Sequence, residues 1–367
     1  MTVRKAEGPL APIRPNLLNL PPYEAVDPPE VLARRAGIPE AEIVKLNGNE
    51  NPYGPSPRVL GALANLDNIA IYPDPLQANM RRALGRYLGV PADGIVVGNG
   101  SDEIIDLLFR AVLGSGDLVV DSTPTFGMYR FTAQVCGGDT VSVPRGEGFE
   151  VDVEGVLKAA RTAKIIVLAS PNNPTGNSVS RSDVERLLAS GKLVIVDEAY
   201  GEFDGESVAP LAFERDNLVV LRTMSKWAGL AGLRVGYGVM PPPLAELLLV
   251  AKPPYNVNQA AEAALLASLE DADLLNERAR LIVRERDRMS AALGSMPGVT
   301  AYPSEANFVL FRVPPGKGKA VYEGMARRGV FVRYYSGARL ADYVRITAGT
   351  PRQTDRVIAA FAAALND

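Results

Sequence analysis

A lysine preceded by hydroxyl side chains and followed by a glycine-rich loop is the residue of this chain best suited to covalent chemistry. Lys226 comes after Thr223 and Ser225, and Arg234 stands eight residues later. The apolar run 218–221 just before them is typical of a buried strand. A lysine amine can condense with an aldehyde cofactor, and hydroxyls with a guanidinium suit the phosphate group of that cofactor. We therefore predict that Lys226 binds such a cofactor rather than lying on the solvated surface, as most lysines do.

A glycine-rich turn, Gly98 to Ser101, leads from a second apolar run into a helical pattern. A helix N-terminus presents unpaired N–H groups and the positive end of its dipole to an anion. Asp102 and Glu103 stand in the first turn and compete with a bound anion, so only the backbone donors and Ser101 favour a phosphate there. The turn is compatible with a phosphate site and also with a purely topological connection.

Asn173 and Asp197 each follow an apolar run, at the place where α/β sheets bind their ligands. The Asn173 amide could donate to a phenolic oxygen on a bound aromatic ring, although its neighbours are also turn formers. A carboxylate at the end of the run 194–196 is costly unless a cation such as a protonated pyridine nitrogen pairs with it. Tyr200 lies within reach of the same ligand. A phosphate cup, a ring amide, a carboxylate and an amine together meet the requirements of pyridoxal 5′-phosphate.

These motifs fall in a region, residues 75 to 255, where helical patterns alternate with short β-branched runs. Strands are expected at 95–97, 118–120, 165–168, 193–196 and 218–221. This alternation predicts an α/β fold with a mostly parallel central sheet covered by helices on both faces.

A second, smaller α+β domain is expected at the C-terminal end. A continuous helix-forming stretch, 259–293, leads into it, and strands are expected at 308–312, 330–333 and 344–347. The proposed division has three parts: an N-terminal arm with the start of the small domain (1–38), a large cofactor-binding domain (39–258) and the C-terminal small domain (259–367). The arm is rich in proline, which excludes a continuous helix.

Composition limits the function of the 367-residue chain. It contains no histidine, which removes the commonest general base and metal ligand, and we predict no metal site. A net charge of −3 without a basic run argues against binding to nucleic acid or an anionic membrane. Cys136 is the single cysteine, residues 1–10 lack a signal-peptide core, and no apolar run approaches the ~20 residues of a membrane helix. We therefore predict a cytoplasmic protein.

Taken together, the motifs resemble those of the fold-type-I pyridoxal-phosphate aminotransferases, and among them the histidinol-phosphate aminotransferase family. The resemblance covers nearly the whole chain. The matching segments are 49–55, 72–75, 98–103, 124–129, 171–176, 197–200, 225–236, 254–258, 306–308 and 345–347. The segments around Lys226 and Asn173 are typical of the whole group, whereas 72–75 and 254–258 point to the narrower family.

The resemblance implies a role for each candidate residue. Lys226 would carry the cofactor and move protons, Asp197 would pair with the pyridine nitrogen, and Tyr200 would act beside them. The remaining cofactor-binding residues would be Ser101, Asp102 through its backbone, Phe126, Asn173, Thr223, Ser225, Arg234 and Tyr72, the last reaching in from the other subunit of a homodimer with shared sites. The substrate would be bound by Tyr23, Asn49, Arg333 and Arg345.

The expected reaction is amino-group exchange between L-histidinol phosphate, or its keto partner imidazole-acetol phosphate, and glutamate or 2-oxoglutarate, in histidine biosynthesis. An aromatic amino-acid aminotransferase is a close alternative, because it also needs a flat pocket and an anion clamp. A decarboxylase of phosphorylated amino acids is a second alternative. A cofactor-binding transcription regulator is disfavoured, since the segment before the fold is too short and proline-rich for a helix-turn-helix module.

Overall fold

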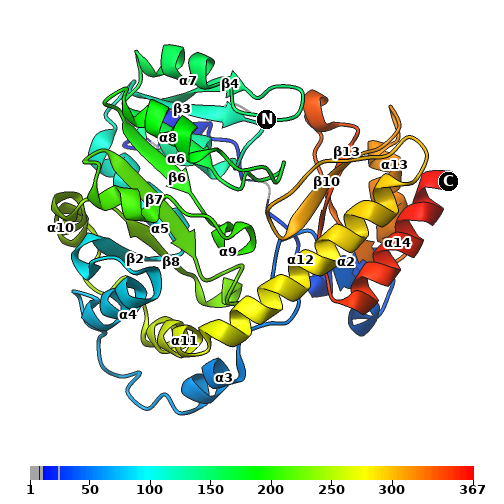
Figure 1. Ribbon diagram of the computed structural model, residues 1–367, viewed down its shortest axis with the longest axis horizontal. Helices are drawn as coiled ribbons and strands as arrows, with labels where there is room; N and C mark the ends of the chain where they lie inside the picture. The colour runs from blue at the N-terminus through cyan, green and yellow to red at the C-terminus, as the bar shows by residue number, and fades with distance from the viewer. Residues whose placement is uncertain (1–7, 9–10, 24) are drawn as a thin grey trace.

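The computed structural model describes residues 8, 11–23 and 25–367 (Figure 1). Residues 1–7, 9–10 and 24 of the expected N-terminal arm lie outside the described residues. The rest of the arm is irregular apart from the short helices α1 (Pro15–Leu18) and α2 (Pro29–Ala36). None of the helices formed by the described residues combines the length and the hydropathy that a membrane crossing needs.

A seven-stranded sheet with the order β2-β8-β7-β6-β5-β3-β4 forms the centre of the larger unit. Its strands are β2 (Ile95–Asn99), β3 (Leu118–Thr123), β4 (Asp139–Pro144), β5 (Ile165–Ala169), β6 (Leu193–Asp197), β7 (Leu218–Thr223) and β8 (Val235–Val239). Only β8 runs antiparallel to its neighbours, β2 and β7. The expected α/β class with a mostly parallel sheet is confirmed. The expectation missed β4 and β8, because neither formed a separate apolar run in the sequence.

Helices cover both faces of this sheet, because successive side chains of each strand point to opposite sides. Ile165 and Val167 of β5 pack into one apolar cluster, whereas Ile166 and Leu168 pack into the other. The first face is covered by α5 (Ser101–Val112), α6 (Met128–Cys136) and α10 (Pro242–Ala251). The second is covered by α4 (Ala78–Leu88), α7 (Val153–Ala160) and α8 (Arg181–Leu188). Further helices of this unit are α3 (Pro57–Ala64) and α9 (Gly201–Asp204).

The smaller unit is built on a four-stranded antiparallel sheet with the order β12-β13-β10-β9. Its strands are β9 (Thr300–Ala301), β10 (Phe308–Arg312), β12 (Arg333–Tyr334) and β13 (Tyr343–Thr347). The helices α13 (Gly318–Arg327) and α14 (Pro351–Asn366) pack on it, and α12 (Ala272–Gly294) connects it to the larger unit (Figure 1). Single 3₁₀ turns are η2 (Glu40–Glu42), η3 (Ala92–Gly94), η4 (Ala209–Phe213), η5 (Ala231–Leu233) and η6 (Ala338–Leu340).

Two expectations about single elements are wrong. The stretch 259–293 forms two helices, α11 (Gln259–Glu270) and α12, separated at Asp271. Asp271 has φ −102° and ψ 24°, outside the helical range, and its carboxylate accepts a hydrogen bond from Arg58 Nε at 2.9 Å. The expected strand 330–333 divides into β11 (Val330–Phe331) and β12, which belong to different sheets.

The strand β1 (Val44–Lys45) pairs in parallel with β11, so a segment assigned to the large domain packs with the C-terminal half of the chain. We therefore propose a division in which residues 44–46 belong to the smaller unit. The other domain boundaries stay a prediction.

Candidate active site

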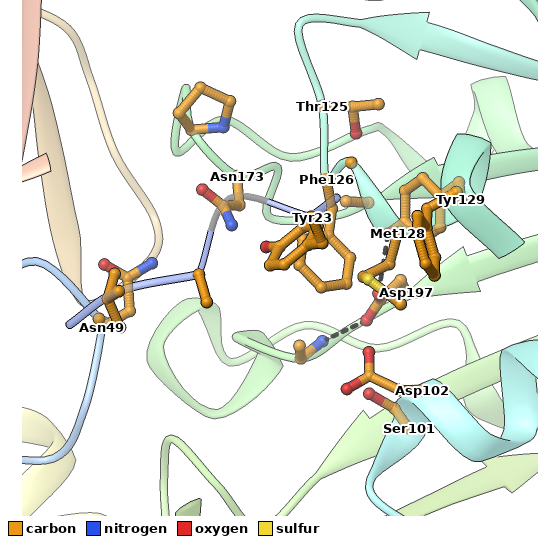
Figure 2. A pocket seen from close by; sticks show the side chains of 18 of the residues that line it. Tyr23, Asn49, Ser101, Asp102, Thr125, Phe126, Met128, Tyr129, Asn173 and Asp197 are labelled. Atoms are coloured by element: carbon orange, nitrogen blue, oxygen red, sulfur yellow. Dashed lines mark hydrogen bonds between the residues drawn. The ribbon is translucent and has the colours of Figure 1, made fainter. Parts of the chain in front are cut away.

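A cavity of about 960 Å³ opens at the carboxyl ends of β5, β6 and β7, where the smaller unit and the N-terminal segment meet the larger sheet. All the candidate residues except Tyr72 line it. Figure 2 shows that Tyr23 and Phe126 lie together on one side of Asp197, and Ser101 and Asp102 at the start of α5 on the other. The structure therefore gathers residues that are spread over more than three hundred positions of the sequence.

Lys226 lies three residues beyond β7 and points its amine into the cavity. Its Nζ donates to the backbone carbonyl of Gly48 at 3.0 Å. Burial lowers the pKa of Lys226 to about 8, and the positive charge of Arg345 acts in the same direction. A large fraction of this amine is therefore neutral at mildly alkaline pH, as a nucleophilic or proton-accepting lysine requires.

Asp197 ends β6 and is only 4% exposed. Its Oδ2 accepts from the Tyr129 hydroxyl at 2.8 Å and its Oδ1 from the Ala199 N–H at 3.0 Å (Figure 2). Burial raises the pKa of Asp197 to about 6, although both hydrogen bonds act against this shift. Among the described residues, no lysine or arginine nitrogen lies within 4 Å of its carboxylate. Asp197 is thus a buried acid that would be stabilised by a cation from outside the described chain.

The start of α5 forms a cup with β8 and Arg234. Gly100 precedes the helix with φ 82°, and a side chain on Gly236 would come within 2.1 Å of the Ser101 nitrogen. Only glycine allows the two backbones to approach in this way. Arg234 Nη2 lies 2.9 Å from Asp102 Oδ2. This ion pair partly offsets the negative charge of Asp102, which was expected from the sequence to disfavour a bound anion.

Thr223 and Ser225 form another part of the wall around this cup. The Thr223 hydroxyl donates to Ser225 Oγ at 3.0 Å and accepts from the Ser225 N–H at 3.1 Å. Both side chains are buried, so their orientation is fixed before any ligand binds.

The middle of the cavity carries the residues expected to contact a ring. Asn173 Oδ1 accepts from Arg345 Nη1 at 2.5 Å. The Tyr200 hydroxyl accepts from Asn49 Nδ2 at 2.9 Å, and burial raises the pKa of Tyr200 to about 12. Phe126 lines the same space at the N-terminal approach to α6. These groups can bracket a flat ligand with polar groups on its edge.

Arg333 and Arg345 are direct cross-strand partners on β12 and β13, and both line the cavity. Arg345 Nη2 donates to the Asn47 carbonyl at 2.6 Å, and its Nε has no hydrogen-bond partner in the structure. Tyr23 packs edge-on against Phe126, with ring centroids 6.3 Å apart. This end of the cavity therefore combines two guanidinium groups with aromatic surface.

Tyr72 is the exception among the candidates. It is 76% exposed, does not line the cavity, and stacks on Tyr255 with centroids 4.4 Å apart. Ile69 and Ile71 beside it are also exposed. A single chain therefore does not bring Tyr72 to its own cavity.

Several lining residues were not among the predicted site residues, and Tyr129, Asn47 and Tyr335 are the polar ones that matter most here. Tyr129 is fully buried and touches Asp197, and it stands one helical turn after Phe126 in a quoted motif. The matched segment 124–129 was the only signal for Tyr129, because α6 begins at Met128 and its packing on the sheet is not visible in the sequence. Nothing in the local sequence of Tyr335 indicated a place in the cavity.

Comparisons with known proteins agree with this geometry. The model of the family "Aminotransferase class I and II" matches residues 41–361. The histidinol-phosphate aminotransferase of Roseiflexus castenholzii is 49% identical over 94% of this chain and 96% of its own length. The chloroplastic enzyme of that name from Nicotiana tabacum is 44% identical over 94% of this chain and 85% of its own. The crystal structure of histidinol-phosphate aminotransferase from Sinorhizobium meliloti with pyridoxal-5′-phosphate superposes with a TM-score of 0.88 and 28% identity, covering 97% and 98% of the two chains.

The fold, the cavity and these matches define an aminotransferase of fold type I, which uses pyridoxal 5′-phosphate. More narrowly, the chain belongs to the histidinol-phosphate aminotransferase family.

Proposed function

We propose that the chain exchanges an amino group between L-histidinol phosphate, or imidazole-acetol phosphate, and glutamate or 2-oxoglutarate, as a step of histidine biosynthesis. The names and similarity of the relatives support this substrate. The observation that carries the proposal is the juxtaposition of a buried amine, a buried acid without a cation and two paired arginines in one cavity.

The residues present fit the cofactor. The Asp197 carboxylate would pair with the pyridine nitrogen, Tyr129 would keep that carboxylate in place, and Lys226 would bind the aldehyde carbon. The phosphate would be bound by Ser101, the Asp102 backbone, Thr223, Ser225 and Arg234. Phe126 would cover the ring, and Asn173 and Tyr200 would bind its phenolic oxygen. Once bound, the cofactor supplies an electron sink that stabilises negative charge at the substrate carbon.

Lys226 would then move the proton. Burial and Arg345 hold the pKa of its amine at about 8, so more of it is neutral near neutral pH than for an exposed lysine, and the neutral amine can accept a proton from the substrate carbon. Tyr200, with a pKa raised to about 12, stays protonated and can donate a hydrogen bond. No histidine competes for this task, and Asp197, whose pKa is also raised toward neutrality, is assigned to the pyridine nitrogen instead.

Arg333 and Arg345 would bind the anionic end of each substrate, with Tyr23 and Asn49 beside them. Planar guanidinium groups suit both carboxylate and phosphate. Two neighbouring arginines therefore allow one cavity to bind a phosphorylated imidazole substrate and glutamate in turn.

We also propose a homodimer in which Tyr72 enters the partner's cavity. The exposed side chains of Ile69, Ile71, Tyr72 and Leu76 favour burial by a second copy of the chain. The cytoplasm is the compartment that we propose, because the single Cys136 leaves no partner for an intrachain disulfide.

A comparison of substrates tests the proposed function. Purified holoenzyme with glutamate as donor should use imidazole-acetol phosphate with a higher kcat/KM than phenylpyruvate. Preference for phenylpyruvate would instead support the aromatic aminotransferase. Release of carbon dioxide from a phosphorylated amino acid would support the decarboxylase.

A further inference from the structure

A second cavity, of about 590 Å³, lies where the loop after β4 meets the sheet of the smaller unit. Its chief lining residues are Arg145, Phe149, Tyr302, Arg312, Arg339 and Tyr343. None of them lines the active-site cavity. The two cavities are therefore separate, and the proposed reaction gives the second one no task.

Arg145 is the buried charge of this second cavity, with 3% of its surface exposed. Its Nε donates to the Ser122 carbonyl at 3.0 Å and its Nη1 to the Phe149 carbonyl at 3.1 Å, whereas its Nη2, which is itself enclosed, has no hydrogen-bond partner among the described residues. Burial lowers the pKa of Arg145 only to about 10, so it remains charged at neutral pH. No carboxylate of the described residues lies within 4 Å of it, which leaves a buried cation with an unused donor.

Two more arginines stand at the rim. Arg339 lies over the Phe149 ring, with its guanidinium carbon 5.4 Å from the ring centroid. Arg312 is the cross-strand partner of Tyr343. Glu147 is the only acidic residue among those that line the cavity, so three positive charges face one negative charge. The cavity therefore favours an anion.

The opposite wall is aromatic. Phe149 and Tyr302 have ring centroids 5.0 Å apart, and the hydroxyls of Tyr302 and Tyr343 lie 3.3 Å apart. The volume of about 590 Å³ lies within the roughly 300–1,000 Å³ of small-molecule sites and is far larger than a single ion needs. We propose that this cavity binds a small aromatic anion, with its carboxylate or phosphate on Arg312 and Arg339, next to the buried positive charge of Arg145, and its ring on Tyr302 and Tyr343.

The bound anion would act as an effector of the active site, because Arg339 bonds to the backbone two residues before Thr125, which lines the active-site cavity. Arg339 Nη1 donates to the Thr123 carbonyl at 2.9 Å, and its Nη2 donates to the Gly146 carbonyl at 2.9 Å. Thr123 is followed by Thr125 and Phe126, which line the active-site cavity. An anion that draws Arg339 toward itself weakens the contact that holds this turn.

Calorimetric titration of the holoenzyme with phenyl phosphate tests the proposal. Arg312→Gln should weaken one binding component about tenfold, as expected for loss of a charge-assisted hydrogen bond. Arg352→Gln removes an exposed arginine outside both cavities and should leave that component unchanged. Arg312 is chosen because it is exposed, whereas replacing the buried Arg145 could prevent folding.

Three further probes define the ligand. Phenol should bind at least about tenfold more weakly than phenyl phosphate, and so should inorganic phosphate, because each lacks one half of the ligand. A comparison of the affinities of benzoate and phenyl phosphate shows whether the cavity prefers a carboxylate or a phosphate. If wild type, Arg312→Gln and Arg352→Gln all bind phenyl phosphate with the same affinities, the proposal is overturned. Phenyl phosphate would then bind only in the active site or elsewhere. Inorganic phosphate binding as tightly as phenyl phosphate would also overturn it.

Discussion

The cofactor side and the substrate side of the active-site cavity are built differently. On the cofactor side, Asp197 and Thr223 end the central strands β6 and β7, and Lys226 follows closely. On the substrate side, Arg333 lies on the two-residue strand β12 and Tyr23 on an irregular segment. One packed sheet therefore sets the geometry of the cofactor side, whereas substrate recognition depends on how separate segments meet that sheet.

The two sides also differ in the charged groups that they present to a ligand. Lys226 is partly buried and Asp197 is buried, and the hydrogen-bond partners of both among the described residues are neutral. Arg345 already donates to the oxygens of Asn173 and Asn47. A ligand exchanges existing neutral hydrogen bonds on both sides, but the cofactor meets both an acid and an amine, whereas an anionic substrate meets only positive groups. We expect substitutions on the cofactor side to have the larger effects.

Lys226→Ala should have the largest effect. Loss of the amine that holds the cofactor and moves the proton should lower kcat/KM by about 10⁴-fold or more. The visible absorption band of the holoenzyme, and its loss on borohydride reduction, provide the second measurement. Lys164→Ala is the control, because Lys164 is an exposed lysine paired with Asp117. Reductive attachment of the cofactor to another lysine in Lys226→Ala protein would contradict the assignment.

Arg345→Lys tests the substrate side. Replacing the planar guanidinium by a point charge should raise KM for both substrates about ten- to a hundredfold, with a smaller change in kcat.

Arg333→Lys should affect the phosphorylated substrate more than glutamate, because Arg333 is the more exposed member of the pair. Steady-state kinetics with each substrate varied give both values. A fall in kcat without a change in KM for Arg345→Lys would place this arginine on the cofactor side instead.

Asp197→Asn examines the buried charge without cofactor. The pKa of Asp197 is raised by burial to about 6, so its ionisation destabilises the cofactor-free fold as pH rises from about 4 through 6. Asparagine does not ionise, and the variant should therefore gain stability relative to wild type, by about 1 kcal/mol between pH 5 and pH 8. Urea unfolding of both cofactor-free proteins at these two pH values measures the difference.

The same variant in the holoenzyme provides the control for that interpretation. There the ionised Asp197 would have a cationic partner, so Asp197→Asn should weaken cofactor binding rather than help folding. A constant stability difference between pH 5 and pH 8 would show that Asp197 does not titrate in this range.

Much of the cofactor side could be predicted from the sequence, because several of its residues lie at or just after the end of an apolar run that becomes a parallel strand. Asn173 after β5 and Asp197 at the end of β6 are examples. Parallel pairing then places their side chains at one edge of the sheet. The contact of Tyr129 with Asp197 was not predictable in the same way, since it depends on how α6 packs across the sheet.

The substrate side was harder to predict because its geometry depends on contacts between distant segments. The pairing of β1 with β11 and the division of 330–333 between two sheets both follow from long-range packing. Arg333 and Arg345 were identified through the resemblance, but only the structure places them as cross-strand partners. Asp271, at the break between α11 and α12, likewise contacts Arg58, more than two hundred residues earlier, which the sequence did not indicate.

Tyr72 extends the comparison to the second subunit, because in the proposed homodimer it completes the cofactor side of the partner's cavity. The cofactor side of a single chain would then lack one residue.

A mixed dimer of Tyr72→Phe and Lys226→Ala subunits tests this proposal. If the sites are shared, one site of the mixed dimer has both defects and the other has neither. Random mixing of the two variants should restore about a quarter of all sites, even though Lys226→Ala dimers are inactive. Activity is measured after mixing and again after separating the heterodimer by two different affinity tags. If Tyr72 acted within its own chain, the heterodimer would contain one site with each defect, and its activity would not exceed half that of the Tyr72→Phe homodimer. Recovery above that level therefore assigns Tyr72 to the partner's cavity, and its absence in a verified heterodimer would leave each chain with its own complete site.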